Sequence, residues 1–171
     1  MTSADFFRKI NMVDIFSQHL DTLRDVSARS RSASDVVLFY VSPLVPLVGL
    51  VFYEVKFADA TITALATSLS IMAGLLFNLL VLLHSLGWPK FEDPIGANVA
   101  QLRRELHANI CYAIVIALVA MVPIVIGSYY GYQDWRRTIS GDVTAYLAIH
   151  FVLTMGLILK RIEALLTHRL D

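Results

Sequence analysis

The chain has 171 residues, enough for one domain, and 57% of them are hydrophobic while only 16% are charged. Soluble domains carry about 25% charged residues, so this composition favours a lipid environment, and a net charge of +0 gives no indication of a direct nucleic-acid partner. The single cysteine, Cys111, excludes an internal disulfide.

Residues 1–35 are predicted to form a cytoplasmic amphipathic helix followed by a hinge. Apolar side chains recur at three- and four-residue spacing between residues 5 and 26, which is typical of a helix with one apolar face. The polar face mixes both signs of charge, whereas a lipid-surface helix prefers a basic face. We therefore favour packing on the bundle or on a neighbouring subunit, with lipid binding as the alternative. The sequence "SARSRSAS" at 27–34 predicts the hinge.

Residues 36–171 contain four segments without Asp, Glu, Lys or Arg, and a membrane-crossing helix needs about 20 mostly apolar residues. The predicted fold is therefore all-α, a four-helix transmembrane bundle with helical cytoplasmic extensions. A buried soluble bundle is the competing interpretation, but four such segments would leave it too little polar surface. The predicted spans are residues 36–53, 61–86, 109–130 and 143–159.

Two spans are expected to continue into the cytoplasm as helices. The cytoplasmic helix 95–108 has no stop signal before the third span, which predicts one rod from about residue 95 to Ser128. At about 1.5 Å per residue this rod exceeds an apolar core of about 30 Å. The tail, residues 160–171, should extend the fourth span in the same way, with Lys160 and Arg161 at the interface.

The distribution of Lys and Arg predicts the orientation. The N-terminal segment, the middle loop and the tail carry five, three and three of these residues, whereas the loops 54–60 and 131–142 carry one and two. The positive-inside rule therefore places both termini in the cytoplasm. The sequence "GSYYGYQDWRR" would supply an aromatic belt at the outer boundary.

Polar residues within the predicted spans are the candidate functional groups. Asn78 and His150 are pore or gate candidates; the alternatives are interhelical hydrogen bonding for Asn78 and ordinary packing for His150. Ala66, Ser70 and Gly74 recur every four residues, which favours close helix packing within or between subunits. No span carries Asp, and no Cys/His cluster has metal-ligand spacing. We expect no enzyme activity, metal or cofactor.

The span layout, with "SLSIMAGLLFNLLVLL" followed by a linker and "LRRELHANICYAIVIALV", resembles small four-span membrane proteins of bacterial phage-defence operons. These include the membrane subunits of the Rex and Kiwa systems and four-span accessory proteins of CRISPR loci. The resemblance implies a homo-oligomer in the inner (cytoplasmic) membrane that senses infection or permeabilises the membrane. It also implies a soluble cytosolic partner from the same operon.

Two functional hypotheses follow. The first is an oligomeric effector or sensor that alters membrane integrity or ion permeability on a cytosolic signal. The second is a non-conducting anchor or scaffold that recruits a soluble partner to the bilayer. In the second case the partner would bind the N-terminal helix and the cytoplasmic part of the rod. The candidate interface residues are Phe6, Phe7, Ile10, Phe16, Arg103 and Arg104.

Overall fold

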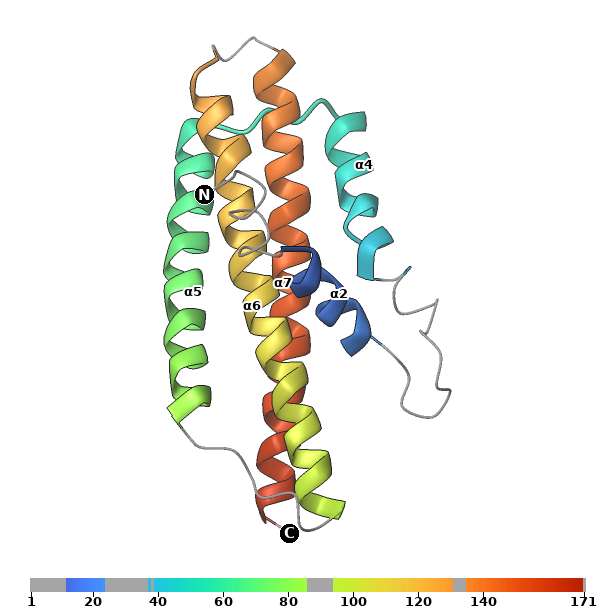
Figure 1. Cartoon of the computed structure of the whole chain (residues 1–171). Helices are drawn as coiled ribbons and strands as arrows, with labels where there is room; N and C mark the ends of the chain where they lie inside the picture. Colours follow the sequence, from blue (N-terminus) through green and yellow to red (C-terminus); the bar gives the residue numbers. More distant parts are fainter. Residues whose placement is uncertain (1–11, 24–36, 38, 86–93, 131–134, 171) are drawn as a thin grey trace, which may run out of the picture.

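The structure is a computed structural model that describes residues 12–23, 37, 39–85, 94–130 and 135–170. No strand occurs among these residues, so the prediction of an all-α chain is confirmed for this part of it. The helices, labelled as in Figure 1, are α2 (Met12–Thr22), α4 (Leu44–Phe52), α5 (Asp59–Ser85), α6 (Pro94–Ser128) and α7 (Trp135–Leu170).

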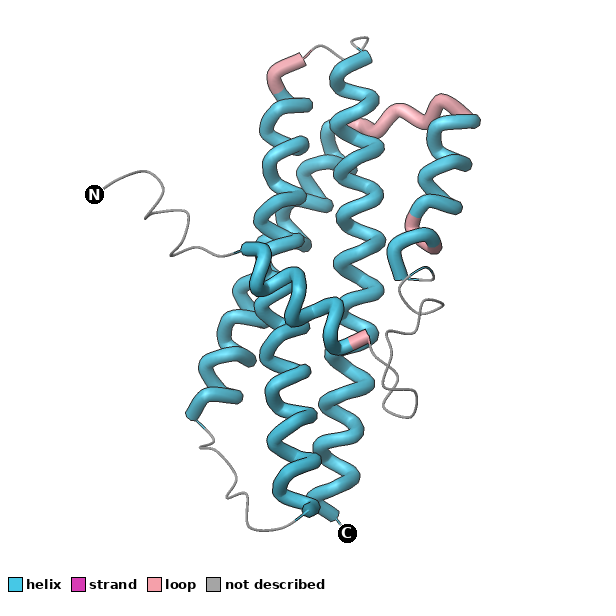
Figure 2. The backbone as a smooth tube through the Cα atoms, turned by 45° about the vertical axis from the view of Figure 1, so that its right-hand side comes forward, coloured by secondary structure: helices cyan, strands magenta, loops and turns pink. Residues whose placement is uncertain are grey.

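Three of these helices, α5, α6 and α7, are long and apolar enough to cross a membrane. They contain 27, 35 and 36 residues and lie side by side in both views (Figures 1 and 2). At about 1.5 Å per residue each exceeds the apolar thickness of a bilayer, about 30 Å. Each of the second, third and fourth predicted spans falls almost entirely within one of these helices.

The predicted rod is confirmed, because α6 runs without interruption from Pro94 to Ser128. Proline suits the first helical position, where its missing N–H is not needed. Pro123 lies inside the helix near its other end. Helix α7 begins at Trp135, eight residues before the predicted span. The charges of Arg136, Arg137 and Asp142 end the apolar run, but none of these residues breaks a helix.

The first predicted span is not confirmed as a membrane-crossing helix. Its helical part, Phe39–Phe52, is short, and a turn at Ser42 and Pro43 interrupts it before α4. Fourteen residues of helix reach only about 21 Å. Proline lacks an N–H and restricts the residue before it, so "SPLVP" cannot continue a regular helix. Glu54, with φ of 48°, ends the segment in the left-handed region.

The core is a seam of apolar side chains between the three long helices. On α6 the buried positions alternate in steps of four and three residues, and on α5 they recur every seven. This pattern is typical of helices that cross at a small angle with side chains fitted into facing holes. The buried residues are Leu69, Leu76 and Leu83 on α5, Leu106, Ile110, Ala113, Ala117 and Ala120 on α6, and Phe151 and Ile158 on α7.

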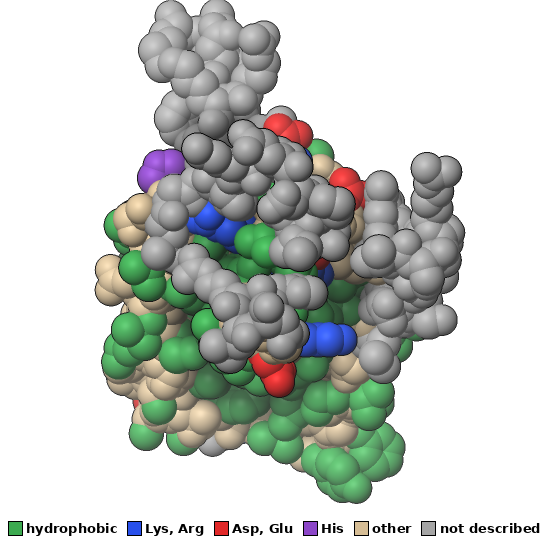
Figure 3. Space-filling model, turned by 90° about the horizontal axis from the view of Figure 1, so that it is seen from below, with side chains coloured by type: hydrophobic (Ala, Val, Ile, Leu, Met, Phe, Trp, Pro, Cys, Tyr) green, Lys and Arg blue, Asp and Glu red, His purple; other side chains and the backbone are tan. Residues whose placement is uncertain are grey.

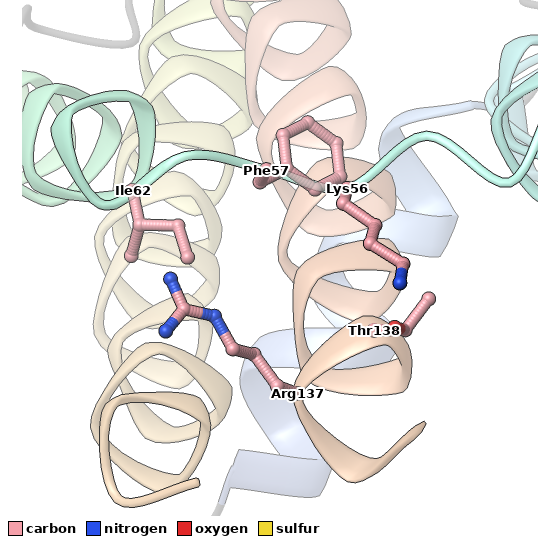
Figure 4. A pocket seen from close by; sticks show the side chains of 5 residues that line it. All are labelled: Lys56, Phe57, Ile62, Arg137 and Thr138. Atoms are coloured by element: carbon pink, nitrogen blue, oxygen red, sulfur yellow. The ribbon is translucent and has the colours of Figure 1, made fainter. Parts of the chain in front are cut away.

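An ion pair joins α5 and α7 at the end of the bundle opposite the C-terminus. Arg137 of α7 donates to Asp59 at the start of α5. The loop before α5 packs beside it, and a Cβ added at Gly141 would lie only 2.8 Å from the Phe57 ring. Figure 4 shows Lys56, Phe57, Ile62, Arg137 and Thr138 around a pocket of about 10 Å³, room for one water at most.

Candidate functional site

Helix α2 lies across the other helices part-way along their length, not at their ends (Figure 1). It packs on α6. Its buried edge contains two polar residues, His19 and Thr22, beside Leu23, while Val13 is 73% exposed. This edge contains Leu23 of the predicted apolar stripe and adds His19 and Thr22 to it. The helix therefore binds the bundle through polar as well as apolar contacts.

Asn109 of α6 accepts hydrogen bonds from both buried polar side chains of α2. Its Oδ1 lies 2.8 Å from His19 Nδ1 and 2.9 Å from Thr22 Oγ1. A carbonyl oxygen can only accept, so His19 donates through Nδ1, and Nε2 of the neutral ring carries the lone pair. Both His19 and Asn109 are 0% exposed. This contact joins residues 90 positions apart in the chain.

Aromatic rings surround the contact. The His19 ring stacks on Tyr112 of α6, with centroids 3.8 Å apart and an interplanar angle of 5°. The Tyr112 hydroxyl in turn forms a hydrogen bond with Nε2 of His150 on α7, at 2.8 Å. Phe39, just before α4, lies with its centroid 5.4 Å from His19 and 4.7 Å from His150. The site thus gathers α2, α6, α7 and the segment before α4.

Arg161 of α7 joins three helices at the edge of the site. Its guanidinium donates to Glu105 of α6 and, through Nη2, to the backbone carbonyl of Thr22 at 2.7 Å. A cation at the last carbonyls of a helix satisfies unpaired acceptors and complements the helix dipole. We call Glu105, Asn109, Tyr112, His150 and Arg161 the α2 dock.

Burial in the dock lowers the pKa of His19 to about 4, with the nearby His150 and Arg161 acting in the same direction, while the bond to Asn109 opposes the shift. Nε2 of His19 has no hydrogen-bond partner among the described residues. Protonation would place an unpaired N–H and a charge in this buried position, which is costly. The docked form of α2 therefore contains neutral His19.

Docking of α2 should weaken as the pH falls below the ordinary histidine pKa of 6.5. Between pH 7.5 and 5 a shift of this size removes about 2 kcal/mol from the docked state, and the loss continues down to about pH 4. Double electron–electron resonance between spin labels at Gln18→Cys and Val152→Cys, in a Cys111→Ser background, should show one distance at pH 7.5 and a broader distribution at pH 5.

Two variants distinguish the contribution of His19 to the pH dependence from that of the other titratable or charged groups that face it. These groups are Tyr112, Glu105, His150 and Arg161. His19→Gln keeps a donor for Asn109 but cannot titrate in this range, so its distance distribution should be the same at both pH values. His150→Gln should retain the pH dependence. A pH dependence that survives His19→Gln would show that another group controls docking.

The predicted site residues do not lie together. His150 is buried in the dock, whereas Asn78 is exposed on α5. Ser70 and Gly74 are also exposed on α5, Ala66 is half-buried there, and a Cβ at Gly74 would meet nothing within 4 Å. The face of α5 that carries these small residues is therefore not covered by another described helix.

The predicted partner-interface residues differ in their surroundings. Phe16 is 43% exposed, with its ring near Tyr40 and Tyr112. Arg103 donates to the backbone carbonyl of Leu83 on α5 at 2.6 Å, and Arg104 is exposed. Phe6, Phe7 and Ile10 lie outside the described residues.

Six residues of the site were not among the predicted functional groups: His19, Thr22, Glu105, Asn109, Tyr112 and Arg161. The position of His19 between Phe16 and Leu23 on one helix edge was the available signal. Within the described ranges no group of three His, Cys, Asp or Glu side chains could hold a metal ion. The dock consists of neutral hydrogen bonds, stacked rings and one ion pair, which is the chemistry of a specific helix–helix contact.

Comparison of the chain with protein-family models, curated proteins and solved structures found no match.

Proposed function

We propose that the protein is an oligomeric sensor and effector of the bacterial inner membrane, in an anti-phage defence system, and that release of α2 alters membrane integrity on a cytosolic signal. The α2 dock is the observation that carries this proposal. Buried polar contacts between helices are specific and are lost together when the helices separate. A polar contact of this kind is therefore better suited than a purely apolar contact to a helix that is either docked or released.

Release of α2 would change the membrane-facing helices. Asn109 would lose both of its hydrogen-bond donors within a largely apolar bundle, and Arg161 would lose its acceptor on α2. Unsatisfied polar groups are costly in an apolar environment, which favours rearrangement or entry of water. Because α6 continues unbroken from the dock to the far end of the bundle, a change at the dock can act along its whole length.

The arrangement of charges supports the orientation proposed from the sequence, with both termini in the cytoplasm. Arg103, Arg104, Lys160 and Arg161 lie at one end of the apolar helices, on the dock side, and Tyr129 and Trp135 lie at the other. Basic residues at the cytoplasmic boundary and aromatic residues at the interface are typical of inner-membrane proteins.

The open face of α5 is the proposed contact with a second copy of the chain. Only 11% of the most apolar window of α5 is buried, against 33% for each of α6 and α7. Small side chains allow close approach of helices in a bilayer, and an amide such as Asn78 hydrogen-bonds across the contact. In the oligomer Asn78 would therefore lie between subunits, as a pore or gate group or as an interhelical contact.

The membrane potential of bacteria that express the chain tests the proposal. Asn109→Leu, which removes the acceptor for α2, should depolarise the cells without any trigger, and Asn78→Leu added to this variant should restore the potential. A voltage-sensitive dye measures both results. An unchanged potential in Asn109→Leu, with the protein assembled and α2 released, would contradict the effector function.

That contradictory result would favour the second function, a non-conducting anchor for a soluble partner encoded in the same operon. The specific observation in its favour is that α2 leaves Met12, Val13 and Phe16 between 43% and 73% exposed. Exposed apolar side chains grouped on one helix are typical of a protein contact. Pull-down with the full chain and its Val13→Ser, Phe16→Ser variant separates this function from the first.

A further inference from the structure

A groove runs between α2, the end of α5 and α6, beside the α2 dock. Its volume is about 460 Å³, within the range of small-molecule sites, about 300–1,000 Å³. All three helices contribute polar side chains to it. The polar lining residues used below are Asp21 of α2, His84 of α5, and Arg104, Glu105 and His107 of α6.

The groove combines cationic and anionic groups in a way that suits a zwitterion. Arg104, His84 and His107 can donate hydrogen bonds to a phosphate, and Arg does so with the most favourable geometry. Asp21 lies in the same lining and can accept from an ammonium group. Glu105 already accepts from Arg161 and from Gln101 Nε2, so its charge is partly compensated. A polyanion would meet two carboxylates here, whereas a zwitterion meets complementary groups.

The position of the groove points to a lipid. His84 lies at the last turn of the apolar helix α5, and Arg104 and His107 lie where α6 changes from a charged to an apolar sequence. Figure 3 views the bundle from the end where α5 finishes, and shows Lys, Arg, Asp and Glu side chains beside a largely hydrophobic surface, with a histidine at the margin. In the proposed orientation this is the depth of the phospholipid headgroups of the inner leaflet.

We infer that the groove binds the headgroup of an amine-bearing phospholipid, such as phosphatidylethanolamine, with the phosphate on Arg104, His84 and His107 and the ammonium on Asp21. The binding does not depend on the effector function and can be tested without it. The lipid contacts α2 through Asp21 and α6 through Arg104. A bound headgroup therefore favours the docked position of α2.

Native mass spectrometry of the purified full chain tests this inference. The delipidated protein is given phosphatidylethanolamine, phosphatidylcholine or phosphatidylglycerol, each with the same acyl chains. We expect the first to bind about tenfold more tightly than the other two, since phosphatidylcholine has no ammonium donor and phosphatidylglycerol no cation. Arg104→Gln and Asp21→Asn should each lower this affinity about tenfold, to the level of the other two lipids.

Matched controls remove the same charges outside the groove. Lys160→Gln and Glu163→Gln, both at exposed positions of α7 near the same end, should leave lipid binding unchanged. Circular dichroism of every variant checks that the helices remain folded, and Arg104→Lys should restore part of the affinity. Equal binding of the three lipids, a preference for phosphatidylglycerol, or equal losses in groove and control variants would each overturn the inference.

Discussion

Replacing Asn109 by Leu is expected to release α2 from the bundle. The substitution keeps a side chain branched at Cγ but removes the acceptor shared by His19 and Thr22, so that a buried N–H of His19 is left without a partner. Each buried polar group left unsatisfied costs about 1–3 kcal/mol, and about 1.4 kcal/mol is a tenfold change in an equilibrium. The released population should therefore rise by a factor of about 5 to 150.

Leu23 provides a reporter, because it is 6% exposed at the end of α2 and makes no polar side-chain contact with the dock. In a Cys111→Ser, Leu23→Cys background, maleimide labelling in membranes measures release. Thr154→Val is the control, since it removes a buried hydroxyl that donates within its own helix, to the backbone carbonyl of His150. An unchanged labelling rate in Asn109→Leu would show that the dock does not hold α2.

A second substitution should reverse much of this effect. Replacing both partners of a buried hydrogen bond by apolar groups of similar shape is close to neutral. His19→Phe keeps a ring to stack on Tyr112 and removes the orphaned donor, while Thr22 still donates to the His19 backbone carbonyl at 2.7 Å. The double variant Asn109→Leu, His19→Phe should thus label more slowly than Asn109→Leu alone.

Replacing Gly74 by Leu is expected to abolish self-association while the chain still folds. A Cβ at Gly74 meets nothing within 4 Å in the single chain, so the added side chain fits without a clash. In an oligomer packed through α5 the same side chain would separate the helices and remove their close contact. Asn78→Leu should have a smaller effect, because an interhelical hydrogen bond in a bilayer is worth about 1 kcal/mol.

Gly156 of α7 is the matched control, because a Cβ there also meets nothing within 4 Å. Disulfide crosslinking through Ser70→Cys, in a Cys111→Ser background, measures the contact in membranes. We expect crosslinking to fall at least about tenfold in Gly74→Leu, since close packing is lost, and to persist in Gly156→Leu. Equal crosslinking in both variants would exclude α5 as the subunit interface.

The long helices could be predicted because their signals are local. An apolar run without charges, with no residue that stops a helix, is sufficient to define α5 and the rod α6, and it acts over a few turns of chain. The first span shows the limit of this reasoning. The segment is hydrophobic enough to cross a membrane, but Pro43 and Pro46 prevent a continuous helix long enough to do so.

The candidate site could be predicted only in part, because its contacts join distant parts of the chain. His150 stood out as a polar residue in apolar surroundings, but its partner Tyr112 and the pair formed by His19 and Asn109 did not. His19 lies 90 residues from Asn109, and no local pattern pairs them. The apolar spacing of the N-terminal segment located only part of the buried edge of α2, which contains Leu23 of the apolar stripe and also the polar residues His19 and Thr22.

The three alanines of α6 that face the core, Ala113, Ala117 and Ala120, have a mechanical consequence. They are at most 1% exposed, so the facing helix lies against them with little intervening side chain. Short side chains in close-packed contact leave few alternative registers, and sliding by one turn would bring bulkier residues into the gap. We therefore expect α6 and α7 to tilt together as one rigid unit, and not to slide past each other along their axes.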